Sequence, residues 1–165
     1  MNKQRNIIIL VLIIIGIIGL SLYTNLNRNR SQPPQGIESG KNIYKSAAIK
    51  FAIEVPKDFK VEDKGVTLTL KHNLGELKIS RNGTQYQTIK SHLGYFDKLR
   101  GVSEIESKEL RINAYQAIRR LEETPDGNRL AYYIMVESFI YTLSTTSQPL
   151  FDDLDQIAKS FQSTP

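Results

Sequence analysis

The amino-acid sequence predicts an α+β domain with a mainly antiparallel sheet, preceded by one N-terminal transmembrane helix. Two observations predict this architecture. An unbroken apolar run, IIILVLIIIGIIGLSLY, fills residues 7–23 without a charge. Beyond residue 41, segments with period-two alternation are interrupted twice by helical spacing, in the order strands, helix, strands, helix.

The apolar run at residues 7–23 is long enough to cross a membrane as a helix. At about 1.5 Å per residue it spans about 25 Å, the short end of what a hydrocarbon core of about 30 Å requires. Lys3 and Arg5 precede it, so residues 1–6 are expected to form a cytoplasmic tail. A cleaved signal peptide is the alternative, although Gly19-Leu20-Ser21 is a poor cleavage site. We expect an uncleaved anchor in the cell membrane.

A polar linker is expected at residues 24–40, which contain Pro33-Pro34 and two glycines. Arg28 and Arg30 follow the apolar run, so the charge difference across it is small. We expect a single-pass protein with its C-terminal domain, residues 41–165, outside the cytoplasm. The chain has no cysteine, which excludes a disulfide framework and a lipid-attachment cysteine.

The first half of the domain shows strand patterns. Apolar side chains alternate along residues 49–55, and Pro56 ends that segment. Alternation returns from Val66 to Lys71, and again over residues 77–80. Residues 72–75, His-Asn-Leu-Gly, have turn composition, so the two segments are expected to form a hairpin with one apolar face.

A helix is predicted from about Thr88 to Gly101. Its expected buried stripe follows helical spacing and consists of Ile89, Leu93, Phe96 and Leu99. Gly101 is a suitable helix-ending residue.

Strands are then predicted at residues 107–112, 115–123, 130–136 and 139–143. The segment Leu130–Val136 is apolar at both alternating sets of positions, as expected for a central strand covered on both faces. Turns are expected at Asn113, at 125–127 and at 137–138.

The last helix has the clearest pattern. Pro149 suits the first turn, and Ser147 is expected to cap the helix through its hydroxyl. One face is expected to be buried, with Leu150, Leu154, Ile157, Ala158 and Phe161. The acids near the N-terminus, where the helix dipole favours them, are Asp152, Asp153 and Asp155.

Two segments resemble PsbP-like (Mog/PsbP) domains: FAIEVPKDFK at Phe51–Lys60, and FIYTLSTTSQPLFDDLDQIAKSFQ at Phe139–Gln162. The resemblance covers about residues 42–162. It implies an antiparallel sheet flanked by helices on both faces, in a membrane-anchored protein of bacterial type. This family includes extrinsic photosystem subunits, a Ran-GTPase-binding branch and many membrane-attached bacterial proteins, and most of its known roles are binding and assembly. None of its functional motifs matches this sequence residue by residue.

The net charge of +5 does not indicate nucleic-acid binding. Residues 1–30 hold four of the 22 Lys and Arg residues and none of the 17 acids. The rest of the chain is therefore nearly neutral, and no dense basic run interleaves with aromatics. Arg119-Arg120 is an isolated pair, whose side chains would point to opposite faces of a strand.

No metal, cofactor or catalytic residue is predicted. His72 falls in a turn and His92 on the expected polar side of the first helix, and zinc would need further ligands. The three helix acids lack the spacing of a calcium loop. The hydroxyl run from Ser144 to Ser147 lacks a nucleophile elbow, and the phosphate-binding glycine motifs are missing. Asn29-Arg30-Ser31 and Asn82-Gly83-Thr84 match the glycosylation sequon.

Strand aromatics could line a binding surface, but core packing is the simpler interpretation; they are Tyr132, Tyr133, Phe139 and Tyr141. Tyr132 and Tyr133 are expected on opposite faces of the sheet. We therefore expect a non-catalytic binding or complex-assembly domain, held in the membrane by residues 7–23, with a protein partner. The alternatives are a membrane-tethered hydrolase using a carboxylate pair, and a secreted solute-binding module after signal cleavage.

Overall fold

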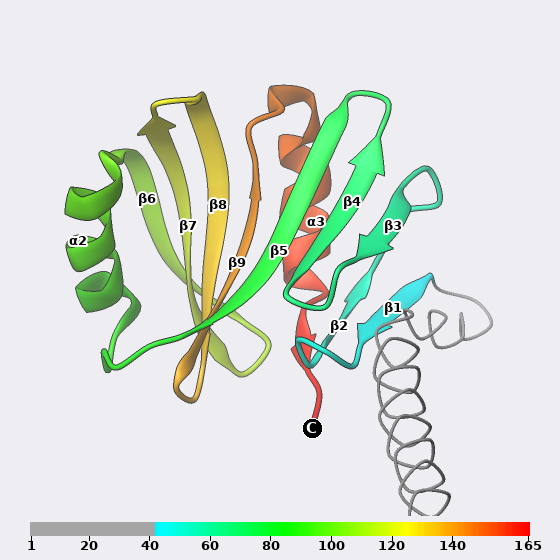
Figure 1. The fold of residues 1–165 in the computed structure, drawn as a ribbon, viewed down its shortest axis with the longest axis horizontal. Helices are drawn as coiled ribbons and strands as arrows, with labels where there is room; N and C mark the ends of the chain where they lie inside the picture. The colour runs from blue at the N-terminus through cyan, green and yellow to red at the C-terminus, as the bar shows by residue number, and fades with distance from the viewer. Residues whose placement is uncertain (1–41) are drawn as a thin grey trace, which may run out of the picture. The chain divides into compact units, whose positions relative to one another are not determined.

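The computed structural model describes residues 42–165, which form two antiparallel sheets and two α-helices (Figure 1). The larger sheet has the strand order β3-β4-β5-β9-β8-β7-β6. Its strands are β3 (Lys60–Asp63), β4 (Thr67–His72), β5 (Gly75–Gly83), β6 (Ser103–Ile112), β7 (Tyr115–Thr124), β8 (Gly127–Val136) and β9 (Phe139–Thr145). The smaller sheet joins β1 (Ile43–Ser46), β2 (Phe51–Glu54) and β10 (Gln162–Ser163).

The predicted apolar run at 7–23 and the linker at 24–40 lie outside the described residues. No helix within residues 42–165 has the length and apolar character needed to span a membrane. The anchor therefore stays a prediction.

The β4–β5 hairpin forms as predicted, with its turn at His72–Gly75. Leu68 pairs with Ile79 in the ladder and both are buried, so one face of the hairpin is apolar. Val66 was expected to share that face, but it precedes the strand and is 75% exposed. Gly75 is required in the turn: its φ is 144°, and a Cβ there would lie 2.6 Å from the Cβ of Ser147.

The helix α2 (Ile89–Arg100) has the predicted ends. Thr88 Oγ1 accepts a hydrogen bond from the Ser91 N–H at 3.1 Å, and Gly101 ends the helix in the left-handed region. The predicted stripe is confirmed at Ile89 and Leu93, which are buried, and Phe96 is half-buried. It is wrong at Leu99, which is 64% exposed.

The final helix is split into a short 3₁₀ helix, η1 (Gln148–Leu150), and α3 (Phe151–Lys159). The predicted apolar face is buried throughout. Ser147 occupies the N-cap position of η1, but its side chain does not cap the helix. Its hydroxyl donates instead to the Leu74 carbonyl at 2.5 Å, which ties the helix entry to the β4–β5 turn.

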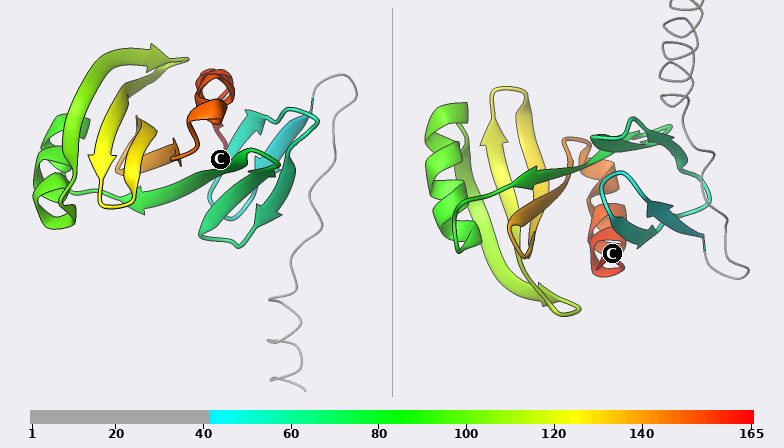
Figure 2. Two further views of the ribbon diagram at one scale, coloured as in Figure 1. Left: turned by 90° about the horizontal axis from the view of Figure 1, so that it is seen from above. Right: turned by 60° about the horizontal axis from the view of Figure 1, so that its bottom comes forward.

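Helices cover both faces of the large sheet, as expected. On one face α3 packs between the two sheets (Figure 2). There Phe161 stacks on Phe51 of β2, with 5.9 Å between the ring centroids. On the other face α2 buries Ile89 against the side of the sheet that carries Tyr133. Tyr132 belongs to the α3 face, so the predicted opposition of the two tyrosines is confirmed.

Short strands account for the elements that the sequence did not predict. β1 and β3 have four residues each and β10 has two, too few to show a period. The predicted strand at 49–55 is shorter than expected, since Ile49 and Lys50 lie in the turn before β2.

Candidate functional site

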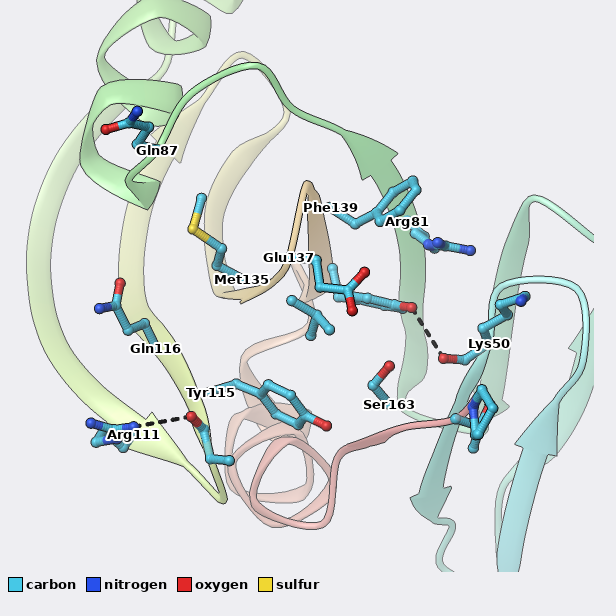
Figure 3. A pocket seen from close by; sticks show the side chains of 15 residues that line it. Lys50, Arg81, Gln87, Arg111, Tyr115, Gln116, Met135, Glu137, Phe139 and Ser163 are labelled. Atoms are coloured by element: carbon cyan, nitrogen blue, oxygen red, sulfur yellow. Dashed lines mark hydrogen bonds between the residues drawn. The ribbon is translucent and has the colours of Figure 1, made fainter.

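A hollow of about 850 Å³ opens where the turns β1–β2, β6–β7 and β8–β9 meet the last residues of the chain (Figure 3). We call it the end hollow. Its polar and charged lining consists of Lys50, Arg81, Gln87, Arg111, Gln116, Glu137, Ser163 and Thr164. Its apolar and aromatic lining consists of Ala114, Tyr115, Met135, Val136, Phe139, Tyr141 and Pro165.

Left-handed backbone shapes the rim of the end hollow. Among residues 42–165, the non-glycine residues with positive φ are Lys50 (56°), Asn113 (51°) and Glu137 (52°). Lys50 and Glu137 line the hollow, and Asn113 precedes the lining residue Ala114. Asn adopts this conformation readily, whereas for Lys50 and Glu137 it costs roughly 1–2 kcal/mol each. Backbone strain of this kind concentrates at functional sites, so Lys50 and Glu137 mark the hollow as a candidate site.

The guanidinium of Arg81 is held by aromatic rings. Arg81 lies on β5 opposite Tyr141 of β9, and its guanidinium carbon is 3.6 Å from the centroid of the Phe139 ring and 5.8 Å from that of Tyr141. Within the described part of the chain, no carboxylate lies within ion-pair distance of Arg81, and its buried Nε–H has no acceptor. The positive charge of Arg81 is therefore not neutralised by the domain.

Tyr141 connects the β1–β2 turn to strand β9. Its hydroxyl donates to the Lys50 carbonyl at 3.1 Å, and the Thr164 N–H donates to the same oxygen at 3.1 Å. Burial raises the pKa of the Tyr141 phenol. Tyr141 therefore stays neutral at physiological pH and acts as a fixed donor that joins β9, the β1–β2 turn and the chain end.

The charge of the end hollow favours anions. Among side chains, Lys50, Arg81 and Arg111 supply three positive charges, against the one carboxylate of Glu137. Arg111 Nη2 donates to the Ala114 carbonyl at 3.1 Å, an interaction that leaves its charge in place. A partly enclosed site with an excess of cations attracts a negatively charged group.

A second group of charges lies on the α2 face, and its arginines form ion pairs with carboxylates. This ion cluster consists of Asp97, Arg120, Glu122, Arg129 and Tyr133. Arg129 Nη2 contacts Glu122 Oε2 at 2.5 Å, and the Tyr133 hydroxyl donates to Glu122 Oε1 at 2.6 Å. Arg120 Nη2 contacts Asp97 Oδ2 at 2.7 Å.

Arg120 and Glu122 of this ion cluster are 2% and 0% exposed. Arg120 Nε lies 3.3 Å from Glu104 and 3.7 Å from Glu122, although neither contact has hydrogen-bond geometry. Burial opposes the charge of Arg120, but its pairing with Asp97, Glu122 and Glu104 outweighs burial and raises its pKa. The ion cluster therefore has a structural role, because its charged side chains contact one another and none is left to bind a ligand.

The histidines lie apart and hold local structure. His72 Nδ1 accepts from the Leu74 N–H at 3.1 Å, so its Nε2 donates to Asp58 at 2.9 Å. His92 was expected on the polar side of α2 but is buried, with Nδ1 3.0 Å from Thr84 Oγ1. Burial lowers the pKa of His92. In residues 42–165, no group of three His, Asp or Glu side chains could hold a metal ion.

The hydroxyl run at residues 144–147 and the acids of the last helix make hydrogen bonds within the domain. Thr145 Oγ1 donates to the Glu76 carbonyl at 2.8 Å, inside the β5–β9 ladder region. Asp155 was attributed to the helix dipole, but it accepts from Arg119 Nε at 3.0 Å and from the Tyr132 hydroxyl at 2.7 Å. This interaction joins α3 to the sheet, and its partners could not be identified from local sequence.

Sequence reasoning did not find the charged residues of the end hollow. Lys50, Arg81, Arg111 and Glu137 come from four separate segments, and none belongs to a motif. The one available signal was Phe139-Ile140-Tyr141, whose alternate aromatics were considered as a binding surface but expected to be core. Tyr141 is buried, and Phe139 forms a half-buried wall of the hollow.

Comparison with solved structures identifies the fold. The chain is similar to cyanobacterial PsbP (CyanoP) from Synechocystis, with a TM-score of 0.56 at 14% identity over 81% of this chain and 97% of that one. It is also similar to a protein from Bacteroides thetaiotaomicron, with a TM-score of 0.50 at 12% identity over 78% of this chain and 50% of that one. No protein-family model and no curated protein matches the sequence. The domain therefore has a PsbP-like fold, and at these identities the likeness concerns the fold alone.

Proposed function

We propose that this chain is a single-pass membrane protein whose PsbP-like domain binds or assembles with a protein partner outside the cytoplasm, without catalysing a reaction. Residues 7–23 form the anchor, residues 1–6 the cytoplasmic tail and residues 24–40 the linker. The fold supports a binding role, because the PsbP-like domains that the sequence resembles act mostly in binding and assembly.

The observation that carries this proposal is the end hollow. It presents three cationic side chains, of which Arg81 stacks on an aromatic ring, and this suits recognition of an anionic group on a partner. The hydrolase alternative needs two carboxylates facing each other across a bond, about 5–9.5 Å apart. Its lining holds one carboxylate side chain, Glu137, and therefore fits binding better than hydrolysis by a pair of acidic side chains.

The location is tested by cysteine labelling, since the natural chain has no cysteine. A Lys98→Cys variant on α2 and a Gln4→Cys variant in the predicted tail are each treated with a membrane-impermeant maleimide in intact cells. We expect labelling at position 98 and protection at position 4 until the membrane is broken. The reverse pattern would contradict the orientation.

The anchor is tested by mass spectrometry of the mature protein. A retained N-terminus supports the anchored form, whereas a mature chain that begins near residue 22 would indicate the secreted solute-binding module.

The partner is tested by crosslinking in intact cells followed by purification in mild detergent. We expect one protein to be recovered repeatedly with the natural chain and with Lys98→Glu, which reverses a charge on α2. We expect the same protein to be lost with Arg81→Glu. Repeated recovery of no protein counts against the proposal.

A further inference from the structure

Arg81 offers a recognition edge that the domain leaves unused. Stacking on Phe139 at 3.6 Å fixes one face of the guanidinium, and Nε is buried. A ligand in the end hollow would therefore meet the edge formed by the terminal nitrogens Nη1 and Nη2. That edge presents parallel N–H groups with the spacing of a carboxylate, which can accept two hydrogen bonds at once.

Apolar side chains line the same hollow. Tyr115, Val136 and Met135 belong to its lining together with Arg81, and Figure 3 shows Tyr115 entering from the β6–β7 hairpin and Arg81 from β5. A ligand that filled this space would need an apolar body next to its charged group. Free phosphate or acetate would leave the aromatic wall uncovered.

We propose that the end hollow binds a carboxylate attached to an apolar or aromatic body. The carboxylate pairs with the terminal N–H groups of Arg81, Lys50 adds positive charge, and the apolar body lies against Tyr115 and Val136. This rests on the proposed binding function and names the chemistry that a ligand presents there. The carboxylate belongs either to a free organic acid or to the C-terminal residue of a peptide.

Glu137 opposes the binding of such a ligand. Its carboxylate is the one negative side chain among the lining residues, and it stands on the β8–β9 turn. A carboxylate entering the hollow therefore meets repulsion from Glu137 as well as attraction from Arg81. Removing this one negative charge is expected to tighten binding, which a purely structural role of the hollow would not produce.

The test uses the full chain in detergent micelles, with ¹⁵N labelling and titration followed by amide chemical shifts. The probes are benzoate, its uncharged analogue benzamide, acetate and inorganic phosphate. We expect benzoate to bind saturably with a Kd of about 0.1–10 mM, as fragments of this size do. Shifts should concentrate at Tyr115, Val136 and the Arg81 Nε–H. Acetate and phosphate should bind at least about tenfold more weakly, and benzamide should give no saturable shift.

Variants separate the roles of the residues. Arg81→Gln should abolish saturable benzoate binding, and Glu137→Gln should lower the Kd about threefold to tenfold. Lys98→Gln, on the exposed side of α2, should leave the Kd unchanged. If Arg81→Gln does not fold, the Glu137→Gln result decides, because that change removes a negative charge and leaves the stack of Arg81 on Phe139 in place.

Three outcomes would overturn the proposal: no saturable shift with benzoate, equal binding of benzamide, or tighter binding of phosphate than of benzoate. The source is distinguished by glycyl-phenylalanine with a free or amidated C-terminus. Tighter binding of the free peptide than of benzoate indicates a peptide terminus, and the reverse indicates a free organic acid. Partner crosslinking fails or succeeds independently of these fragment titrations, so failure of the protein-partner proposal is distinguishable from failure of the carboxylate site.

Discussion

Arginine side chains occupy two regions of this domain, and the two regions treat them in opposite ways. In the ion cluster under α2, Arg120 and Arg129 are both paired with Glu122, which is completely buried. In the end hollow, Arg81 rests on an aromatic ring and has no carboxylate partner among residues 42–165. In the ion cluster the arginines are paired with carboxylates, whereas in the end hollow the charge of Arg81 remains available to a ligand.

This difference separates stability from recognition. A buried arginine that lost its carboxylate would leave an uncompensated charge inside the protein, so breaking the ion cluster should strongly destabilise the domain. A guanidinium held by stacking is fixed in place without being neutralised, so it can still bind an anion. The comparison predicts large stability effects in the cluster and small ones in the hollow.

The largest expected effect is that of Glu122→Gln in the ion cluster. The substitution removes the charge that Arg120 and Arg129 share, and we expect it to lower the free energy of unfolding by about 3–5 kcal/mol. Urea unfolding measures the change. The matched control is Glu123→Gln on the exposed side of the same strand, which should change stability by less than about 0.5 kcal/mol. Equal effects of the two variants would break the comparison.

A second paired charge, on the α3 face, should give an intermediate effect. Asp155→Asn removes the negative charge that accepts from Arg119 and Tyr132, and we expect a loss of about 1–3 kcal/mol. Asp152→Asn, an exposed acid in the first turn of the same helix, should cost only a few tenths of a kcal/mol. A larger loss for Asp152→Asn would mean that the helix dipole, rather than the pairing, accounts for these acids.

Alkaline pH should weaken the fold through its buried tyrosines. Burial first, and then the negative charge of Glu122, raise the pKa of Tyr133. Because the unfolded phenol loses its proton near pH 10, this contribution to stability is fully present below about pH 10 and is lost above it.

The free energy of unfolding, measured between pH 8 and 11.5, should fall above about pH 10. Tyr133→Phe should make this fall shallower by up to about 1.4 kcal/mol per pH unit above pH 10. An unchanged slope would show that Tyr133 does not titrate differently in the folded and unfolded states.

The smallest expected effect is that of Arg81→Gln on stability. It removes the stack on Phe139, which is worth about 0.5–1 kcal/mol, and leaves no carboxylate unpaired. The corresponding change in the other region, Arg120→Gln, leaves Asp97 and Glu122 without this partner and should cost several times more. Thermal unfolding of the two variants side by side tests the contrast, and similar losses would remove it.

Long periodic segments made much of the fold predictable from the sequence. The strand at Leu130–Val136 was identified by apolar residues at every position, and α3 by one continuous apolar face with acids near its start. Val66 and Leu99 broke the pattern because periodicity reports where an apolar side chain could be buried, whereas contact depends on where the neighbouring element ends. Strands of two to four residues had no measurable period at all.

The candidate site was not predictable for a related reason. The guanidinium of Arg81 is held in place by the Phe139 ring, and the two residues are neighbours because β5 pairs with β9. Glu122 lies in the sequence Leu-Glu-Glu-Thr-Pro, where it resembles an ordinary surface acid, yet strand alternation places it under α2. Both roles depend on partners distant in sequence, and composition or spacing within one segment does not contain them.

The pairing of β10 with β2 has a consequence for how the domain is made. In the ladder Ala52 pairs with Gln162, and Phe51 pairs with Ser163. The Glu54 N–H also donates to Ser160 Oγ, 106 positions away in sequence. At synthesis rates of about 5–20 residues per second, β2 is synthesised roughly 5–20 s before these partners. Contacts of such long range also slow folding itself. During this interval Phe51 lacks the ring of Phe161, so the nascent chain exposes apolar surface on β2 until residues 161–163 pack against it.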